Sequence, residues 1–378
     1  MAKHRFYFLE PSKVGAQHIT MIEGYLSALS SSRAITDKYD LFLSASKSTF
    51  EALPTDLTSR FGCVAVPVMN PAKRRLVIKT FVELFVVLRY MARLVPGDVL
   101  FVSCVLPTTL WLLEISNRVL NRGGVHIVLH GEIEGLFDTT VQSFRSFGYW
   151  VKKWLKSRKS QSRIMLVVLD DFIRDRLTHD FPGKLTKANV SVIHHPVIPM
   201  FSAEVVDNDG EKPRVCFIGY RSRFKGFDEY VHMASNNPSV NYLAIGGAKV
   251  ESISEGTIED LGPNDAYHRE ISRCAAAVFP YTALYACSLS AAVLDALATG
   301  VPIKSLDRPF FRSLAEYFGP EIVTVTGSTE ELSIELSCDN LARSHKSRAA
   351  RLERLARSKY GVDAVQASFE KLLLSPLS

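Results

Sequence analysis

Three cations lie close together where a short apolar segment gives way to a predicted helix. The stretch FIGYRSRFKGFDEY, residues 217–230, places Arg221, Arg223 and Lys225 between Gly219 and Gly226. Parallel α/β proteins bind anions where a strand ends and a helix begins, because the amides of the first helical turn are free to donate. The stretch therefore predicts a phosphate site, and a solvated surface turn is the plain alternative.

A second candidate site lies in YTALYACSLSAAVLDALATGVPIKS, residues 281–305. Ser288 or Ser290 can cap a helix that runs to Leu297, and the small residues at its start leave backbone amides open to a phosphate. Asp295 lies inside this helix. Its carboxylate is either an ordinary surface group or an acceptor for ribose hydroxyl groups.

The elements that would position these residues are strands and helices in alternation. Several strand candidates are near-continuous apolar runs, as expected for parallel strands covered on both faces, and helical patterns separate them. The candidates are residues 5–9, 39–45, 63–68, 98–104, 125–130, 164–169 and 190–195, then 214–219, 241–247, 275–281, 301–305 and 321–327.

A polar stretch, FSAEVVDNDGEKP at 201–213, breaks this alternation. We interpret it as a linker between an N-terminal domain, residues 1–200, and a C-terminal domain, residues 214–378. The last helical pattern, DAVQASFEKLLL, is amphipathic, so we expect it to cross back to the N-terminal domain. The fold class is α/β with two Rossmann-like domains.

The bulk composition is that of a soluble globular enzyme. The chain has 378 residues, 47% of them hydrophobic and 22% charged, which favours two domains. The net charge of +6 is compatible with phosphates or an anionic membrane surface and does not predict nucleic acid binding. The longest apolar region, residues 76–95, is interrupted by Lys79, Glu83 and Arg89, which predicts a helix buried on one side rather than a membrane span.

The cysteines and the N-terminal residues indicate a cytoplasmic protein. None of the six cysteines forms a CxxC pair, and most lie in apolar segments, so we expect buried free thiols rather than disulfides or zinc ligands. The first residues, MAKHRFYFLEPSK, lack the apolar core of a signal peptide.

The two stretches, in this order, resemble the C-terminal domain of GT-B fold nucleotide-sugar glycosyltransferases. The closest resemblance is to the retaining "glycosyl transferases group 1" family of bacterial polysaccharide biosynthesis. That group has a G-R-x(4)-K-G turn, which Gly219, Lys225 and Gly226 match, with the arginine displaced by one place to Arg221. It also has E-x(7)-E-A-M-A-x-G-x-P, whose second half matches residues 295–302, whereas its first glutamate falls on Cys287.

The first half of the chain carries a weaker form of the same resemblance. The loop after the first strand contains Gly15 where the family commonly has two glycines, and VHIVLHGEIEGL resembles the strand that ends in His-Gly, giving His130 and Gly131. The resemblance implies two domains facing a cleft, with the acceptor bound by the first domain and the nucleotide sugar by the second.

The resemblance also implies a role for each matching residue. Arg221 and Lys225 would hold the donor diphosphate, together with Gly15, Gly219, Gly226 and the backbone of residues 287–290 (Cys287, Ser288, Leu289 and Ser290). Asp295 would bind the ribose, and His130 would lie beside the transferred sugar. The nucleotide would be UDP or GDP. No metal or other cofactor is expected, because LDD at 169–171 is better explained as a strand end and a helix cap.

Retention of the anomeric configuration is the family expectation, but the thiol of Cys287 cannot replace the glutamate as an acceptor. An inverting enzyme would need a general base. The candidates are His18, in the loop after the first strand, and Glu132 or Asp138, after the fifth. Each has an ordinary alternative, since a loop histidine is often a surface group and an acid after a strand is often a cap.

A third segment, residues 144–163, mixes aromatic and basic side chains. Helical spacing places Phe147, Trp150 or Val151, and Trp154 along one side, beside Lys152, Lys153 and Lys156. Aromatic residues next to lysines suit the headgroup layer of an anionic membrane, and a second basic cluster lies at 72–79. We therefore expect peripheral contact with the inner face of the cell membrane and a lipid-linked saccharide acceptor. A packed helix with a solvated basic face is the alternative.

Two other classes of function remain open. An epimerase acting on nucleotide sugars would share the fold, and it would need more acidic residues in the cleft. A non-catalytic nucleotide-binding protein is favoured by the replacement of the family glutamate by Cys287.

Overall fold

The computed structural model divides the chain into two compact units. The described residues are 3–15, 18–69, 76–120, 124–137, 143, 146–159, 162–197, 212–247, 258–262, 266–337, 341, 352, 354 and 356–374. The first unit comprises Met1–Pro196 and Val362–Ser378, and the second comprises Val197–Gly361. Most of the expected linker lies outside the described residues.

The first unit is built on a seven-stranded sheet of order β3-β2-β1-β4-β5-β6-β7 in which every neighbouring pair is parallel. Its strands are β1 (His4–Leu9), β2 (Tyr39–Ala45), β3 (Gly62–Ala65), β4 (Val99–Val102), β5 (Gly124–Val128), β6 (Ile164–Val168) and β7 (Val190–Val192). All seven were predicted from the sequence. The central strands were recognisable because they are apolar on both faces; β4, for example, is buried throughout, whereas the edge strand β3 is exposed.

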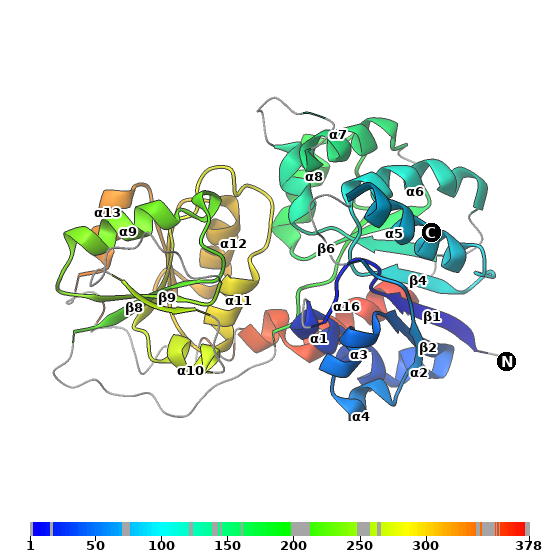
Figure 1. Ribbon diagram of the computed structural model, residues 1–378, viewed down its shortest axis with the longest axis horizontal. Coiled ribbons are helices and arrows are strands. Elements are labelled where there is room, and N and C mark those ends of the chain that lie inside the picture. The colour runs from blue at the N-terminus through cyan, green and yellow to red at the C-terminus, as the bar shows by residue number, and fades with distance from the viewer. Residues whose placement is uncertain are drawn as a thin grey trace. The chain divides into compact units, whose positions relative to one another are not determined.

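Helices cover both faces of this sheet (Figure 1). They are α1 (Ile19–Ser31), α2 (Arg33–Lys38), α3 (Lys47–Ala52), α4 (Thr55–Thr58), α5 (Leu76–Met91), α6 (Pro107–Leu120), the 3₁₀ helix η2 (Gly131–Leu136), α7 (Phe147–Ser157), α8 (Asp171–Asp180) and α16 (Val362–Leu374). No helix in the described part of the chain combines the length and the apolar character needed to cross a bilayer.

The C-terminal helix α16 belongs to the first unit, where it packs on α1. Its Phe369 ring lies 5.4 Å from the ring of Tyr25 and 5.3 Å from that of Phe101. The hydroxyl of Ser32 also donates a 2.6 Å hydrogen bond to Glu370. The second unit therefore ends at Gly361 and not at residue 378, because the apolar side of α16 is buried in the first core.

The second unit holds a six-stranded parallel sheet of order β10-β9-β8-β11-β12-β13. Its strands are β8 (Arg214–Ile218), β9 (Asn241–Ile245), β10 (Glu259–Gly262), β11 (Ala276–Phe279), β12 (Ile303–Leu306) and β13 (Val323–Thr326). Five of these were predicted. The exception is β10, whose sequence EDLG is short and polar because it is an edge strand with an irregular register.

Helices again connect the strands of this sheet, and β8 lies at its centre (Figure 1). They are the 3₁₀ helix η3 (Arg223–Lys225), α9 (Phe227–Asn236), α10 (Tyr267–Ser272), α11 (Ala291–Ala298), α12 (Pro309–Phe318) and α13 (Thr329–Glu335). The strand order reverses between β8 and β11, since the chain adds β9 and β10 on one side of β8 and then crosses to add β11, β12 and β13 on the other. Ligands of open α/β sheets bind at such a reversal.

Candidate functional site

The carboxyl end of β8 meets the first turn of α11 at Gly219. This glycine has φ 92°, and a β-carbon there would lie 3.4 Å from the β-carbon of Ala292 and 3.7 Å from the ammonium nitrogen of Lys225. The same ammonium lies 5.5 Å from the ring centre of Tyr281. The fold thus brings the predicted Gly219 and Lys225 together at the start of α11.

The first turn of α11 has the features of an anion site. Ser290, the N-cap residue, makes no capping bond to the helix, and its hydroxyl lies 2.8 Å from the phenol oxygen of Tyr281. Among the described residues, the buried hydroxyl of Ser288 has no hydrogen-bond partner. The turn carries no acidic residue, so its amides and the positive end of the helix dipole are available to a phosphate.

Gly226 has a structural reason to be glycine. Its φ is 66°, and a β-carbon would lie only 1.8 Å from the carbonyl oxygen of Pro280. The close approach fixes the turn that carries Lys225 against the end of β11. The following helix is a poorer anion site than expected, because Asp228 and Glu229 already occupy the first turn of α9.

Arg221 does not take the position predicted for a diphosphate clamp. Its side chain is only 1% exposed, and its guanidinium donates to Asp260 on β10 at 2.5 Å and to the carbonyl of Ala244 at 3.1 Å. Burial lowers the pKa of Arg221, and the Asp260 carboxylate opposes that shift. Arg221 therefore fastens β10 to the end of β9, and Lys225 is the cation that lies at α11.

Asp295 lies on α11 with one carboxylate oxygen already held. The phenol of Tyr267 donates a 2.8 Å hydrogen bond to Asp295 Oδ2. Burial raises the pKa of Asp295, while the Tyr267 bond and the nearby cations favour its charged form. Its other oxygen is the one that a ribose hydroxyl could reach. Tyr267 was missed from the sequence, because nothing local marks a tyrosine of α10 as a neighbour of α11.

Cys287 and Leu289 complete the predicted donor segment. Cys287 is fully buried and is not part of a disulfide, and Leu289 is partly exposed. A buried thiol cannot line an open surface, so any donor contact at residue 287 would come from its backbone.

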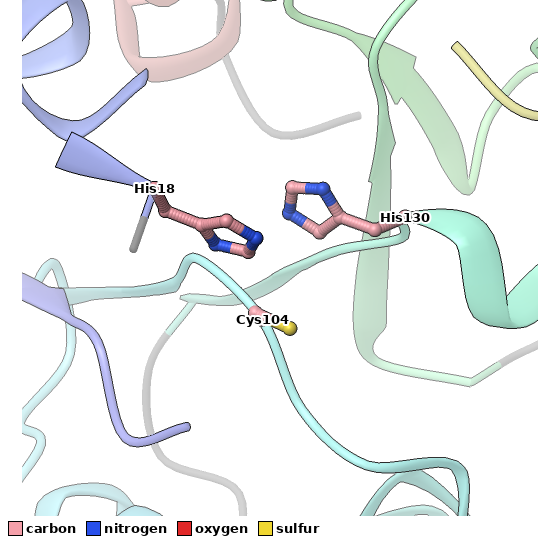
Figure 2. Close-up of side chains that lie close together, drawn as sticks. All are labelled: His18, Cys104 and His130. Carbon is pink, nitrogen blue, oxygen red and sulfur yellow. The ribbon is translucent and has the colours of Figure 1, made fainter. Parts of the chain in front are cut away.

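In the first unit, His130 and His18 form a stacked pair after β5 and β1. Their ring centres lie 4.9 Å apart with an interplanar angle of 22°, and Cys104 is beside them (Figure 2). His130 Nε2 lies 2.7 Å from the carbonyl oxygen of Ser103. Burial, with the neighbouring His18 as a second cause, lowers the pKa of His130, so its imidazole is neutral at neutral pH.

His18 is paired with a buried carboxylate that the sequence did not single out. His18 Nδ1 lies 3.6 Å from Glu10 Oε2, and Glu10 is 0% exposed. The Glu10 carboxylate accepts hydrogen bonds from the amides of Ser12 and Lys13 and from the hydroxyl of Ser103. His18 also has φ 62°, and a left-handed conformation in a non-glycine residue is typical of functional sites. The Glu10 carboxylate thus lies close to His18 Nδ1 without a direct hydrogen bond between them among the described residues.

The other predicted residues of this unit lie near the same loops. Glu132 follows His130, accepts a 2.7 Å hydrogen bond from its amide, and has a pKa that burial raises to about 7. Gly15 has φ 59° with open space around it, and its amide donates to Ser48 Oγ. Asp138 lies outside the described residues.

Two groups of side chains in the described structure could each supply three metal-ligand atoms: His18, Cys104 and His130, and Asp170, Asp171 and His194. In the first, the two imidazole planes are stacked at 22°, and a nitrogen lone pair lies in the plane of its ring, so a shared metal position would need the rings to turn. In the second, Asp170 caps α8 through the amide of Phe172, and Asp171 pairs with Arg174 at 3.0 Å.

The helix cap expected from LDD at 169–171 is confirmed, because Asp170 accepts a hydrogen bond from the amide of Phe172 at the start of α8.

The predicted lipid-facing side of α7 is instead its packing side. Val151 and Trp154 are fully buried, and the Trp150 ring lies 5.3 Å from that of Trp111 on α6. Lys153 lies 4.2 Å from the centre of the Trp111 ring. The simpler interpretation, a packed helix with a basic outer edge, accounts for this segment.

Comparisons with known proteins identify the fold. No protein-family model and no curated protein matches the sequence. Several solved structures match over nearly the whole chain. HepE from Anabaena, in complex with UDP-glucose, is 12% identical with a TM-score of 0.68, covering 99% of this chain and 100% of its own. Sucrose-phosphate synthase from Thermosynechococcus elongatus is 13% identical with a TM-score of 0.69, covering 98% of each chain.

Two further similar structures bear on the functional alternatives. WaaG, a glycosyltransferase involved in lipopolysaccharide biosynthesis, is 11% identical with a TM-score of 0.61, covering 98% of this chain and 100% of its own. A putative UDP-N-acetylglucosamine 2-epimerase from Listeria monocytogenes is 11% identical with a TM-score of 0.57, covering 99% of this chain and 98% of its own. The chain therefore has the GT-B fold of nucleotide-sugar glycosyltransferases.

Proposed function

We propose that the protein is a glycosyltransferase that moves a sugar from a UDP- or GDP-linked donor to a saccharide acceptor. The observation that carries the proposal is the first turn of α11. There the Lys225 ammonium lies near a helix start without a side-chain cap, beside the Ser288 hydroxyl, which has no partner among the described residues. This place is the reversal point of the second sheet. A diphosphate would supply acceptor oxygens for the amides and the hydroxyl and negative charge for the ammonium.

The same groups would act during the reaction. Negative charge grows on the leaving diphosphate as the glycosidic bond breaks, and oriented amides with a fixed cation stabilise that charge without reorganising. Asp295, with Oδ2 held by Tyr267, would accept a hydrogen bond from the ribose. In this proposal the cation and the amides meet the charge demand, so transfer requires no metal.

Retention of the anomeric configuration is part of the proposal and follows the sequence resemblance. Inversion is the second candidate, and one observation favours it. His18 has a buried carboxylate, Glu10, beside Nδ1, which is the arrangement that a general base on an acceptor hydroxyl would need. In either case, the neutral His130 would serve as a hydrogen-bonding group beside the sugar.

We further propose that the enzyme works in the cytoplasm, peripherally on the inner face of the cell membrane, in the synthesis of a surface polysaccharide or glycolipid. The acceptor would then be lipid-linked. The alternative activity, epimerisation of a nucleotide sugar, is supported by the likeness to the putative 2-epimerase. An assay without acceptor distinguishes the two activities, because only an epimerase interconverts free nucleotide sugars under that condition.

The first experiment is a thermal-shift titration with UDP, GDP, ADP, TDP and CMP. Saturating ligand at about a hundred times its Kd stabilises the folded state by about 2.7 kcal/mol. We expect one diphosphate to stabilise the wild type, and Lys225→Ala to weaken its affinity roughly tenfold or more through loss of a charge-assisted bond. Arg223→Ala is the matched control, because Arg223 is 92% exposed and pairs with Asp228. No shift with any nucleotide, or equal shifts in both variants, would contradict the proposed site.

A further inference from the structure

Helix α5 buries two charged side chains and exposes four large apolar ones, although its C-terminal half also buries apolar residues. Lys79 is 4% exposed and Glu83 is 1% exposed. The exposed large apolar residues of this helix are Val77 (69%), Ile78 (54%), Phe81 (62%) and Phe85 (63%). A helix on the surface of a water-soluble domain normally has the opposite arrangement.

The buried charges explain why the helix is held in this rotation. Lys79 donates a 2.8 Å hydrogen bond to the carbonyl of Ser12. Glu83 accepts from the amide of Leu106 at 2.9 Å and from the hydroxyl of Thr109. Burial raises the pKa of Glu83 to about 7. A rotation of α5 about its axis that buried Phe81 and Phe85 would break these hydrogen bonds and leave buried polar groups unpaired. The phenylalanines therefore stay exposed.

The exposed residues form one continuous surface. Val77, Phe81 and Phe85 follow one another at four-residue spacing, and Ile78 lies between them on the same side. Arg89, one turn beyond Phe85, is also exposed. These five residues make up what we call the outer face of α5, on the side of the first sheet that also carries α6 and α7 (Figure 1).

The charged residues that flank α5 in the sequence are all cations. In sequence, Lys73, Arg74 and Arg75 directly precede the helix, and Arg93 follows it. The only acidic residue between 72 and 93 is Glu83, which is buried. Exposed apolar side chains on a helix with the exposed cations Arg89 and Arg93 at its C-terminal end match the acyl boundary and headgroups of an anionic lipid layer.

We propose that the outer face of α5 docks the protein on an anionic phospholipid membrane, with the helix lying in the plane of the interface. A second copy of the chain suits the face less well, because a two-fold contact would set the same cations against one another. The inference rests on the proposed function in one respect: docking would bring the enzyme to a lipid-linked acceptor. Vesicle binding itself needs no catalysis.

The test compares wild type, Phe81→Ser/Phe85→Ser and Phe147→Ser in sedimentation with vesicles. Phe147 is the matched control because it is a half-exposed phenylalanine of α7 in the same unit. We expect the wild type and Phe147→Ser to bind vesicles of phosphatidylglycerol with phosphatidylcholine and to release at high salt. The double variant should bind at least roughly tenfold more weakly, since it loses two inserting rings.

A second readout uses Phe85→Trp, whose emission should shift to the blue on anionic vesicles and be quenched by brominated lipid. The proposal is overturned if the wild type ignores these vesicles, if the double variant binds as well as the wild type, or if sedimentation shows a dimer that the double variant abolishes. Diphosphate binding by the double variant, measured by thermal shift, should match the wild type. A loss of vesicle binding with intact nucleotide binding thus separates this proposal from the proposed function.

Discussion

The pKa of His126 is set by its burial. It lies on β5, is 4% exposed, and among the described residues its Nδ1 has no hydrogen-bond partner. Burial lowers its pKa to about 4, because the charged imidazolium is poorly solvated there. The sequence VHIVLH shows the histidine within an apolar run, but only the burial of both sheet faces makes its protonation unfavourable.

We predict that His126 makes the first unit sensitive to acid. The unfolded histidine titrates near 6.5 and the folded one near 4, so between these values the unfolded state binds more protons and stability falls as pH falls. The loss from this residue should be about 3 kcal/mol between pH 7 and pH 4. Denaturant unfolding of the wild type and of His126→Phe, followed by tryptophan fluorescence, measures the difference. Equal pH dependence in the two proteins would contradict the prediction.

At the scale of elements, the position of a turn depends on what packs against it. The turn η3, which carries Lys225, ends at Gly226, and the carbonyl of Pro280 at the end of β11 fills the space where a side chain would be. Gly15, in the loop after β1, has a similar φ of 59° with no atom within 4 Å of the position of a β-carbon. The two glycines look alike in the sequence, yet only Gly226 is required by a neighbouring element.

We therefore predict different costs for the same substitution. Gly15→Ala should cost about 1 kcal/mol, the strain of a left-handed non-glycine residue. Gly226→Ala adds a clash with backbone, so it should cost roughly 3 kcal/mol or more and should displace Lys225. Thermal unfolding with and without the stabilising diphosphate reports both effects. The comparison fails if both alanine variants lose the same stability and bind nucleotide equally.

At the scale of the whole molecule, the chain leaves the first unit at Pro196 and returns to it at Val362. The return is made by α16, whose Phe369 is fully buried against Tyr25 and Phe101. The three tryptophans of the chain are Trp111, Trp150 and Trp154. All lie in the first unit, so tryptophan fluorescence reports the unfolding of that unit alone.

We predict that Phe369→Ala destabilises the first unit by about 3–5 kcal/mol, the cost of emptying a buried phenylalanine site. Fluorescence-detected unfolding should move to lower denaturant. Phe318→Ala is the control, because Phe318 is also fully buried but belongs to the second unit. An equal shift of the fluorescence transition in both variants would contradict the prediction, because it would mean that the two units unfold together.

The sequence by itself predicted the α/β class and twelve of the thirteen strands in the described part of the chain. It also predicted an anion site at the start of α11. Near-continuous apolar runs are typical of parallel strands. Glycines and small residues at a helix start are needed for the local backbone geometry, so the sequence shows them directly. The edge strand β10 was missed because EDLG has no apolar pattern to detect.

Only the tertiary structure decided which side of each helix is covered and which charges pair. Arg221, after β8, meets Asp260 on β10; Tyr267 on α10 meets Asp295 on α11; and Glu10 meets His18 within the loop after β1. The same is true of α5, which exposes Phe81 and Phe85, and of α7, which buries Val151 and Trp154. The physical reason is that periodicity gives the spacing of residues along an element, whereas partners and burial depend on how sheet order brings distant elements together.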